Sequence, residues 1–456
     1  MKTQSHYFGA VTQTNLSPAG LAALILAAIL ILTVNRKYVV HVFLMSAILI
    51  PASQHLVVAT YNLQALRLII IVAAVRLLFS KLASPHTWLR LPLTTIDKTF
   101  ICWIVSNCVM FSILWGETDA VTNRLGFAFS CLGPFLILKM LIRDDDDVTH
   151  AIHALAMVTA MCACFMALEQ LTGKNLISEL MGTSSTAGIR DGRIRAQASF
   201  AHPLLAGSFG AVLIPLFVGL LWRPGGSRFW AKVGIVGGFI MAASSMSSTA
   251  VLGIAAGAGS LCLWPVRRSL GSIRWAVVAV LVALHLSMKA PVWALIARIN
   301  LTGGSSGYHR YQLIDQAIRR FGEWWLFGTK YQSTWGWDMW DSINWYVNEG
   351  TTGGVLTMLL FIAVLVVAFK KIGVARAVAD EAGDHDGELF IWALGATLFA
   401  NAVSFFGISY FDQSFVMWCA TLVIISKATF PSVTSSDEEE IAEDTLEVPE
   451  RELAGA

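Results

Sequence analysis

Apolar stretches of about the length needed to cross a bilayer recur along almost the whole chain. A helix needs about 20 consecutive, mostly apolar residues to cross the hydrocarbon core. On this basis we expect about 12–13 membrane-spanning helices. The expected spans cover residues 18–34, 38–52, 62–80, 99–116, 121–142, 148–170, 203–222, 230–246, 248–265, 273–290, 352–370, 388–408 and 411–428.

The composition supports the same fold class. Of the 456 residues, 56% are hydrophobic and only 14% are charged, which excludes an ordinary soluble domain. Helices satisfy their backbone hydrogen bonds internally, as a chain in lipid must do. The sequence therefore predicts an all-α polytopic membrane protein, with the membrane domain over residues 1–433. No cleavable signal peptide is expected, because no apolar segment with a cleavage site follows Lys2.

Basic residues are concentrated in alternate connections between the expected spans. The short connections between them, at 53–61, 117–120, 245–248 and 409–411, contain no Lys or Arg. Since Lys and Arg are enriched in cytoplasmic connections, we expect the basic set inside and loops 172–201 and 291–351 outside. An odd number of spans then puts the N-terminus outside. The basic set consists of Arg36, Lys37, Lys81, Arg90, Lys98, Arg143, Arg223, Arg228, Lys232, Arg267, Arg268, Arg274, Lys370, Lys371 and Arg376.

The last segment, residues 434–456, differs from the rest of the chain. It contains nine acidic residues and one arginine. A run with so much like charge and so few apolar residues stays solvated. We therefore expect a disordered, acidic cytoplasmic tail, for which a solubilising role is favoured over partner binding.

Signatures of metal and nucleotide chemistry are missing from the sequence. All seven cysteines lie within expected spans, so neither disulfides nor a zinc site is expected. The sequence has no P-loop, no Gly-rich dinucleotide turn and no zinc-protease signature. We therefore expect no metal, no cofactor and no nucleic-acid partner.

The first outward loop contains a cluster of arginines. Arg190, Arg193 and Arg195 fall within six residues, shortly before the span that opens at His202-Pro203. Basic residues outside oppose the insertion bias, so another interaction must favour them. Arginine binds phosphate oxygens in pairs and keeps its charge, which suits an anionic ligand at the membrane surface. Binding of ordinary lipid head groups is the alternative.

The second outward loop contains a predicted amphipathic helix after a flexible linker, Gly303–Gly307. Its expected apolar stripe consists of Ile314, Ala317, Ile318, Phe321 and Trp325, and its expected polar face of Gln312, Asp315, Arg319, Arg320 and Glu323. This pattern is typical of a helix that lies on the bilayer surface. Arg310 extends the apolar stripe and therefore needs an anionic partner, either a protein carboxylate or a ligand phosphate.

The same loop is rich in tryptophan. Six of the sixteen tryptophans are Trp324, Trp325, Trp335, Trp337, Trp340 and Trp345. Tryptophan is enriched at membrane interfaces, and its ring also stacks on the apolar faces of sugars. The sequence leaves both roles open.

Three segments follow one another in an ordered set. The first, GRIRAQASFAHPLLAGSFGAVLIPL at 192–216, is an Arg-rich outer loop that runs into a span. The second is HRYQLIDQAIRRFGEWWLFGT at 309–329, and the third, DSINWYVNEGTTGGVLTMLLF at 341–361, feeds the next span. In order and spacing they resemble the O-antigen ligase and O-antigen polymerase superfamily of bacterial envelope enzymes.

The resemblance implies a membrane glycosyltransferase of GT-C-like architecture in the bacterial inner membrane, with its active site on the periplasmic face. Its donor would be a glycan on undecaprenyl pyrophosphate, and no nucleotide sugar would be used. The glycan would move to a hydroxyl on an acceptor glycan or lipid. Arg190, Arg193, Arg195 and Arg310 would stabilise the charge on the departing pyrophosphate.

Further residues are expected to contact this substrate. His202, Asn344 and Trp340 lie in or beside the three segments. Arg67, in the third span, lines the same pyrophosphate site or extends to the membrane surface opposite to that reached by Arg76.

The chain departs from the family at one position of chemical importance. Ligases of the family carry a His-Asn pair near the end of the large loop, where the histidine is thought to assist acceptor attack. Here the stretch is DSIN at 341–344. Asp341 is the first candidate for the general base, with Glu349 and His309 as fallbacks. Asp341 as the ion-pair partner of Arg310, and Glu349 as a cap of the next span, remain open.

The missing histidine favours a polymerase of O-antigen or exopolysaccharide repeat units over a ligase that transfers glycan to lipid A core. A chain-length regulator is a further partner that fits a polymerase. The alternative from another class is a flippase or transporter of lipid-linked glycans. Ion-coupled carriers place carboxylates in mid-membrane, whereas Glu169 and Asp412 lie near the outer ends of their spans.

Overall fold

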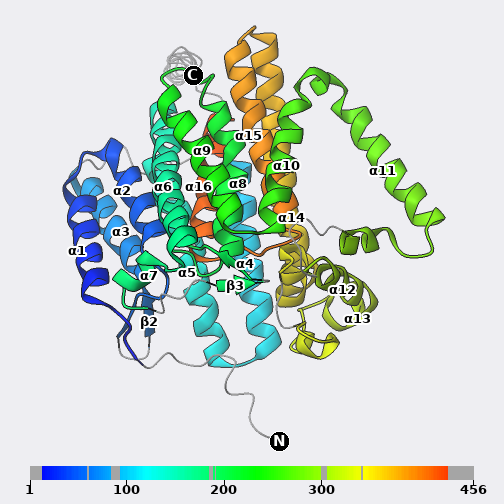
Figure 1. Ribbon diagram of the computed structural model, residues 1–456, viewed down its shortest axis with the longest axis horizontal. Coiled ribbons are helices and arrows are strands. Elements are labelled where there is room, and N and C mark those ends of the chain that lie inside the picture. Colours follow the sequence, from blue (N-terminus) through cyan, green and yellow to red (C-terminus); the bar gives the residue numbers. More distant parts are fainter. Residues whose placement is uncertain are drawn as a thin grey trace, which may run out of the picture.

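The computed structural model describes residues 13–58, 61–83, 93–183, 188–190, 192–298, 306–339 and 343–429. These residues are helical almost throughout (Figure 1), and each predicted span coincides with a helix. These helices are α1 (Pro18–Thr33), α2 (Arg36–Leu49), α3 (Ala65–Ala83), α4 (Thr95–Trp115), α5 (Thr118–Leu141), α6 (Asp145–Thr172), α8 (Pro203–Gly219), α9 (Arg228–Ser244), α10 (Ser248–Cys262), α11 (Leu270–Ser287), α14 (Trp345–Glu381), α15 (His385–Ser404) and α16 (Asp412–Ala428). The predicted tail at 434–456 lies outside the described residues.

Short elements lie in the connections. The helical ones are α7 (Leu176–Leu180), η2 (Trp264–Ser269), η3 (Val292–Arg298), α12 (Ser306–Arg319), α13 (Phe321–Trp324) and η4 (Gln332–Trp335). The strands are β1 (His55–Val58), β2 (Tyr61–Gln64), β3 (Gly188–Arg190) and β4 (Arg193–Arg195). Within the described part of the chain they form two antiparallel hairpins, β1–β2 and β3–β4.

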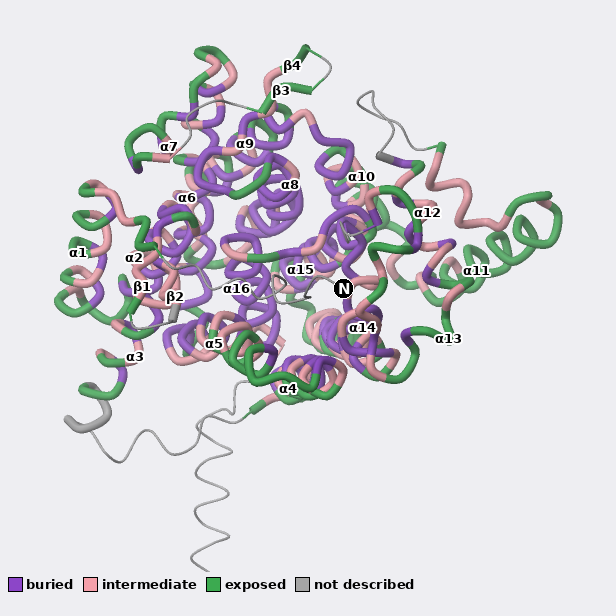
Figure 2. The backbone as a smooth tube through the Cα atoms, turned by 90° about the horizontal axis from the view of Figure 1, so that it is seen from below, coloured by how far each residue is buried: buried purple, intermediate pink, exposed green. Residues whose placement is uncertain are grey.

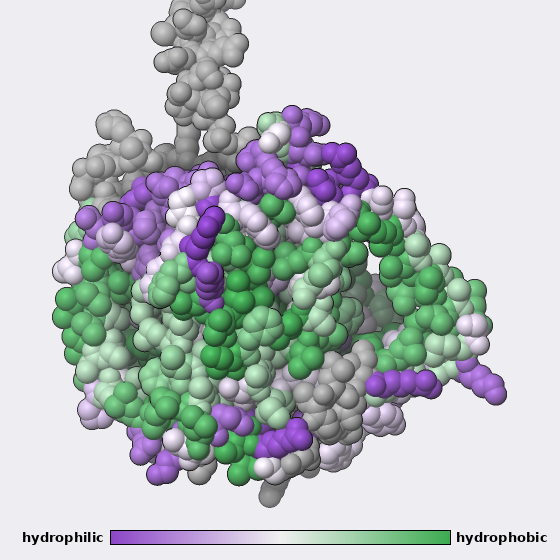
Figure 3. Space-filling model, turned by 45° about the horizontal axis from the view of Figure 1, so that its top comes forward, coloured by the Kyte–Doolittle hydropathy of each residue, from purple (hydrophilic) through white to green (hydrophobic). Residues whose placement is uncertain are grey.

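The surface and the helix lengths are those of a membrane protein. Six helices in the described ranges are long and apolar enough to cross a bilayer: α4, α5, α6, the pair η2–α11, α14 and α15. The helices α1, α8 and α10 are apolar but shorter. A broad apolar surface separates two hydrophilic ends in Figure 3. The prediction of an all-α multi-pass membrane protein is confirmed in this general form.

The core is built around α16. Every residue from Gln413 to Ser426 of this helix is buried, and α16 lies among α2, α5, α6 and α8. Figure 2 shows the buried residues concentrated in these central helices and exposed residues on α1 and α11 at the periphery. The helix α11 contains no buried residue and extends away from the bundle in Figure 1.

Connections that carry the predicted cytoplasmic residues meet at one end of the bundle, which we call the basic end. Arg36, at the start of α2, pairs with Asp147 at the start of α6 at 3.1 Å. Arg267 of η2 and Arg376 of α14 both pair with Glu388 at the start of α15. The alternation of basic residues in the sequence therefore predicted correctly which connections lie together.

The other connections meet at the opposite end, which we call the loop end. Gln413, at the start of α16, donates through Nε2 to the backbone carbonyls of Ile50 and Ser199. The backbone N–H of Trp345, at the start of α14, donates to the carbonyl of Phe405 at 2.8 Å. The described parts of loops 172–201 and 291–351 thus lie at the same end of the bundle, as predicted.

The orientation of α12 differs from the prediction. Arg310, Leu313 and Ala317 form its buried face. Ile318 and Phe321, which were expected in the same stripe, are exposed. The buried face is set by contacts of α12 with η3 and α14, which a helical period cannot reveal. In the predicted linker, residues 303–305 lie outside the described part of the chain, and the helix begins at its last two residues.

Asp315 was expected on the polar face of α12, and this expectation is wrong. The side chain is buried. Its Oδ1 accepts a hydrogen bond from Nε1 of Trp293 at 3.2 Å, and its Oδ2 accepts one from Nε of Arg319 at 2.6 Å. Asp315 therefore joins α12 to η3.

Replacement of Lys139 by methionine is expected to destabilise the fold strongly. Lys139 of α5 pairs with Asp97 of α4, whose side chain is fully buried, and methionine leaves that carboxylate without its counter-charge. Breaking a buried ion pair costs about 3–5 kcal/mol. The matched control is Arg268→Met, because the Arg268 side chain is 74% exposed beside Asp380 and such pairs contribute about 0–1 kcal/mol. Thermal unfolding in detergent measures both variants, and equal shifts in melting temperature would contradict the expectation.

Candidate functional site

The β3–β4 hairpin directs three arginine side chains to one of its faces. Its register pairs Arg190 with Arg193 and Gly188 with Arg195. Residues opposite each other in an antiparallel pair share a face, as do residues two apart along one strand. Arg190, Arg193 and Arg195 therefore point to the same side, and the isoleucines between them point to the other. The close spacing of the three arginines thus reflects hairpin geometry.

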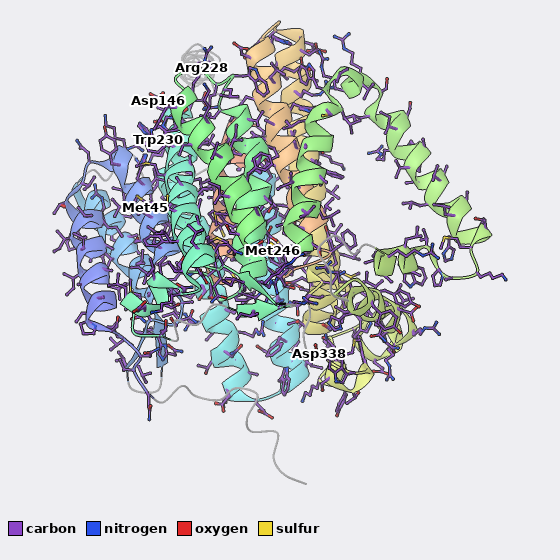
Figure 4. The ribbon with its side chains drawn as sticks, in the orientation of Figure 1. Met45, Asp146, Arg228, Trp230, Met246 and Asp338 are labelled. Atoms are coloured by element: carbon purple, nitrogen blue, oxygen red, sulfur yellow. The ribbon has the colours of Figure 1, made fainter. Side chains whose placement is uncertain are left out.

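The segment after the hairpin is fixed to the turn between α9 and α10. The backbone N–H of Ala196 donates to the carbonyl of Ser244 at 3.0 Å. Nε of Arg195 donates to the carbonyl of Ser245 at 3.3 Å. Met246, labelled toward the loop end in Figure 4, has a φ of 46°, which few residues other than glycine adopt. These bonds hold Arg195 against the last residue of α9 and the turn that leads into α10.

A buried carboxylate positions the next residues of the chain. Oε2 of Glu169, near the end of α6, accepts hydrogen bonds from the backbone N–H groups of Gln197 and Ala198 at 3.0 and 2.9 Å. Nδ2 of Asn175 donates to the carbonyl of Ala198 at 2.8 Å. Ala198 has a φ of 49°, a strained conformation that persists only when neighbouring groups enforce it. Glu169 therefore sets the path of the chain between the hairpin and α8.

Arg310 is buried at the same end of the bundle, with 5% of its surface exposed. Its Nη2 donates to Oγ1 of Thr249 in the first turn of α10 at 2.7 Å, and its Nε has no hydrogen-bond partner. A Cβ on Gly407 would lie 3.3 Å from its Cζ, so glycine permits this close approach. Within the described ranges, no carboxylate pairs with Arg310.

His202 caps the first turn of α8. Its Nδ1 accepts a hydrogen bond from the backbone N–H of Leu204 at 3.1 Å, and Pro203 occupies the first helical position. Proline is favoured there because it has no N–H to leave unpaired. The His-Pro pair thus starts α8 and holds the imidazole at the loop end.

Arg190, Arg195, His202 and Arg310 influence one another electrostatically, and we call them the arginine group. Desolvation and the charge of Arg190 lower the pKa of both Arg195 and Arg310 below the usual value of arginine. Desolvation, then the charges of Arg195 and Arg190, lower the pKa of His202 to about 4. The N-termini of α8 and α10 add the positive ends of two helix dipoles. The arrangement is therefore suited to binding an anion.

The other predicted site residues take different positions. Arg193 belongs to the same hairpin face but is exposed, and His309 is half-buried on α12 beside Arg310. Trp340 and Asp341 lie outside the described residues. The predictions that Asp341 is the general base, or the ion-pair partner of Arg310, therefore stay predictions.

Arg67 is held by groups outside the arginine group. Its Nη1 donates to the carbonyl of Asn62 at 2.7 Å, and its Nε donates to Oγ of Ser130 in α5 at 3.0 Å. Arg76, further along α3, donates to the carbonyls of Ile31 and Val34 at the end of α1. The two arginines thus extend to opposite ends of the bundle, as one of the two predicted alternatives requires.

Asn344 has a structural contact that the sequence analysis did not predict. Its Oδ1 accepts a hydrogen bond from the backbone N–H of Val347 at 3.1 Å, which caps α14. Asparagine is among the best residues for this position. The contact accounts for this side chain without a substrate.

Glu349 lies in the interior and does not cap the start of α14, so that expectation is wrong. Its Oε2 accepts hydrogen bonds from Nε1 of Trp103 and Nδ2 of Asn107, at 2.8 and 2.9 Å. Its Oε1 accepts one from Nε1 of Trp345 at 2.8 Å. A carboxylate that holds three buried side chains is a structural anchor between α4 and α14, and we do not propose it as the general base.

The tryptophans of the second outer loop divide into two groups. Trp324, Trp335 and Trp345 are buried and donate their N–H groups to Ala317, Glu323 and Glu349, respectively. Trp325 and Trp337 are exposed. The first group is part of the protein core, so among the described tryptophans of this loop the second group is the one available for a membrane interface or for sugar stacking.

Sequence reasoning missed the partners of Arg310. Thr249 lies in the first turn of α10 and Gly407 in the connection between α15 and α16, and neither matches a motif. The sequence does contain one indication of this site: the polar run SSMSST at 244–249 separates two apolar spans. Its buried Ser247, whose Oγ has no hydrogen-bond partner, belongs to the same run.

Replacement of Glu169 by alanine is expected to release the hairpin. The change leaves the N–H groups of Gln197 and Ala198 unpaired, at a cost of about 1–3 kcal/mol for buried groups. Trypsin should then cleave after Arg190, Arg193 or Arg195 much faster than in the wild type. Glu179→Ala, an exposed acid of the same loop, is the control and should leave cleavage unchanged. Equal cleavage of all three proteins would show that Glu169 does not hold the segment.

The chain was also compared with known proteins. No protein-family model matches it, and no curated protein matches it significantly. The function is therefore argued from the arginine group and its surroundings.

Proposed function

We propose that this chain is a membrane-embedded glycosyltransferase that moves a glycan from undecaprenyl pyrophosphate to a hydroxyl of an acceptor glycan or lipid. The preferred reaction is polymerisation of O-antigen or exopolysaccharide repeat units, because the histidine of the ligases is missing from DSIN at 341–344. In this proposal the protein lies in the bacterial inner membrane, with the loop end at the periplasmic face.

One observation carries the proposal: Arg310 is buried without a carboxylate partner among the described residues. A buried charge is unfavourable unless an opposite charge and hydrogen bonds compensate it. The charge of Arg190 increases the cost. A negatively charged ligand would supply the missing counter-charge to Arg310, and a diphosphate, whose oxygens a guanidinium binds in pairs, has this character.

The location of the site suits a lipid-linked donor. At the loop end, Arg310 of α12 donates to Thr249 of α10, and Arg195 of β4 donates to Ser245 just before α10. An apolar surface lies between the two hydrophilic ends of the protein (Figure 3). A polyprenyl chain would lie against that apolar surface while its diphosphate reached the arginines. A free phosphate compound would need no apolar surface beside the site.

Glycosyl transfer at this site would follow a simple course. The bond between the anomeric carbon and the phosphate oxygen breaks, and a bond from that carbon to the acceptor oxygen forms. The electron pair stays on the departing pyrophosphate, where positioned guanidinium groups stabilise it electrostatically. The proton of the acceptor hydroxyl passes to a general base, for which Asp341 remains our candidate.

Arg310→Ala is expected to lower the rate of glycan transfer about 100- to 1,000-fold, as loss of a group that stabilises developing charge does. The assay uses purified protein in liposomes that contain an undecaprenyl-pyrophosphate oligosaccharide, and the products are resolved by size. Arg320→Ala, one residue beyond the end of the same helix, is the matched control, because Arg320 and its partner Glu323 have side chains that are 38% and 43% exposed. It should retain nearly full activity.

The product pattern separates the possible functions. A ladder of longer lipid-linked glycans, lost in Arg310→Ala, supports a polymerase. A single transfer that requires an added acceptor, such as lipid A core, supports a ligase. If no bond forms but the donor becomes accessible from the opposite leaflet, the protein is a flippase and the proposal is wrong. Equal activity of Arg310→Ala and Arg320→Ala would remove its central argument.

A further inference from the structure

The ring of His202 is held in a single protonation pattern by the start of α8. Its Nδ1 accepts a hydrogen bond from the backbone N–H of Leu204 at 3.1 Å. A backbone N–H can only donate, so Nδ1 carries no proton in this arrangement. The proton of the neutral ring therefore resides on Nε2, which is left free to donate.

The surroundings of the ring oppose a second proton. A proton on Nδ1 would break the bond to Leu204 and expose the first turn of α8. The positive end of the helix dipole disfavours a cation at this position. The charged groups that act on the ring are Arg195 from β4 and Arg190 from β3, and both are cations. Partial desolvation of the ring and, after it, these charges lower the pKa of His202 to about 4. The residue keeps a solvent-exposed surface, and its ring is neutral near pH 7.

A neutral imidazole among arginines has a specific chemical use. It supplies a directed hydrogen-bond donor without adding another charge to a site that already contains several. A helix N-terminus that keeps a histidine uncharged is a recognised way to make such a donor. Nε2 already carries a proton and the lone pair of Nδ1 accepts from Leu204, so neither nitrogen offers a free lone pair to the acceptor hydroxyl in this arrangement.

We propose that His202 is an uncharged donor of fixed tautomer, whose Nε2–H binds an oxygen of the diphosphate held by the arginine group. The inference rests on the proposed function for the identity of the ligand. It adds an assignment that the charges alone do not make: one contact to the diphosphate is neutral and directional. Arg190, Arg195 and Arg310 supply the charge, and His202 fixes the orientation of one oxygen.

Two variants distinguish the capping role of Nδ1 from the donor role of Nε2–H. In His202→Asn, Oδ1 takes the place of Nδ1 and still caps α8, but the hydrogen-bond donor at the position of Nε2 is lost. In His202→Gln, the side-chain amide reaches the place of Nε2 and retains a donor, although the cap is weakened. We expect His202→Asn to melt like the wild type and to bind undecaprenyl pyrophosphate about 10- to 100-fold more weakly. We expect His202→Gln to melt at a lower temperature and to keep binding within about tenfold of the wild type.

The tautomer itself is measured without any glycan substrate. Nitrogen-15 NMR of histidine-labelled protein in nanodiscs identifies the His202 signals by their loss in His202→Asn. We expect a protonated Nε2 and an unprotonated Nδ1, unchanged from pH 8 to pH 5. Inorganic pyrophosphate should shift the Nε2–H resonance saturably, and the shift should weaken in Arg310→Ala. A protonated Nδ1, or a charged ring at pH 6, would falsify the inference.

Failure of the inference and failure of the proposed function have different signatures. If pyrophosphate shifts the His202 resonance but no glycan is transferred, the anion site stands and the glycosyltransferase proposal falls. If glycan is transferred but His202→Asn binds undecaprenyl pyrophosphate as tightly as His202→Gln does, the proposed function is supported and the proposed role of His202 is wrong. Abolished transfer in both variants, with wild-type melting temperatures, would indicate a general base and overturn the inference.

Discussion

The free-energy cost of burying an unpaired charge next to an apolar medium determines how the charged residues of this protein are arranged. At the basic end two arginines meet buried carboxylates: Arg36 pairs with Asp147, and Arg267 pairs with Glu388. At the loop end, Arg195 and Arg310 have a backbone carbonyl and a hydroxyl as their described partners. Arg319 and Arg320 at the same end pair with Asp315 and Glu323. Buried Arg310 thus differs from the paired arginines, because no described carboxylate compensates its charge.

Much of the architecture was predictable because membrane constraints are local in sequence. Span length and the alternation of basic residues predicted the helices and the two groups of connections. The excess charge of Arg190 and Arg195 and the inward position of Arg310 were visible in loops 172–201 and 291–351. The details that failed are tertiary. The burial of Asp315 depends on Trp293, and that of Glu349 depends on Trp103, which is distant in sequence.

Strained backbone is found around the site and not around the basic end. The non-glycine residues with positive φ in the described part of the chain are Ala198, Met246, Asp338 and Asp412. Ala198 lies within the segment from Arg195 to His202, and Met246 lies in the turn to which Arg195 and Ala196 are bonded. Such conformations persist when surrounding contacts enforce them, as Glu169 does for Ala198. The arginine group is thus presented by a loop that is fixed in advance, and little ordering is needed when an anion binds.

The β3–β4 hairpin also restricts how this loop can change in evolution or by engineering. Its strands are joined by only two residues, Asp191 and Gly192, and Gly192 has a φ of 72°. Because side chains alternate between the faces of a strand, an insertion that shifts the register by one residue sends an entire strand's side chains to the opposite face. A single added residue would thus remove Arg195 from the hairpin face that it shares with Arg190, without altering any arginine. The length of the turn is therefore as much a part of the site as the charges that it separates.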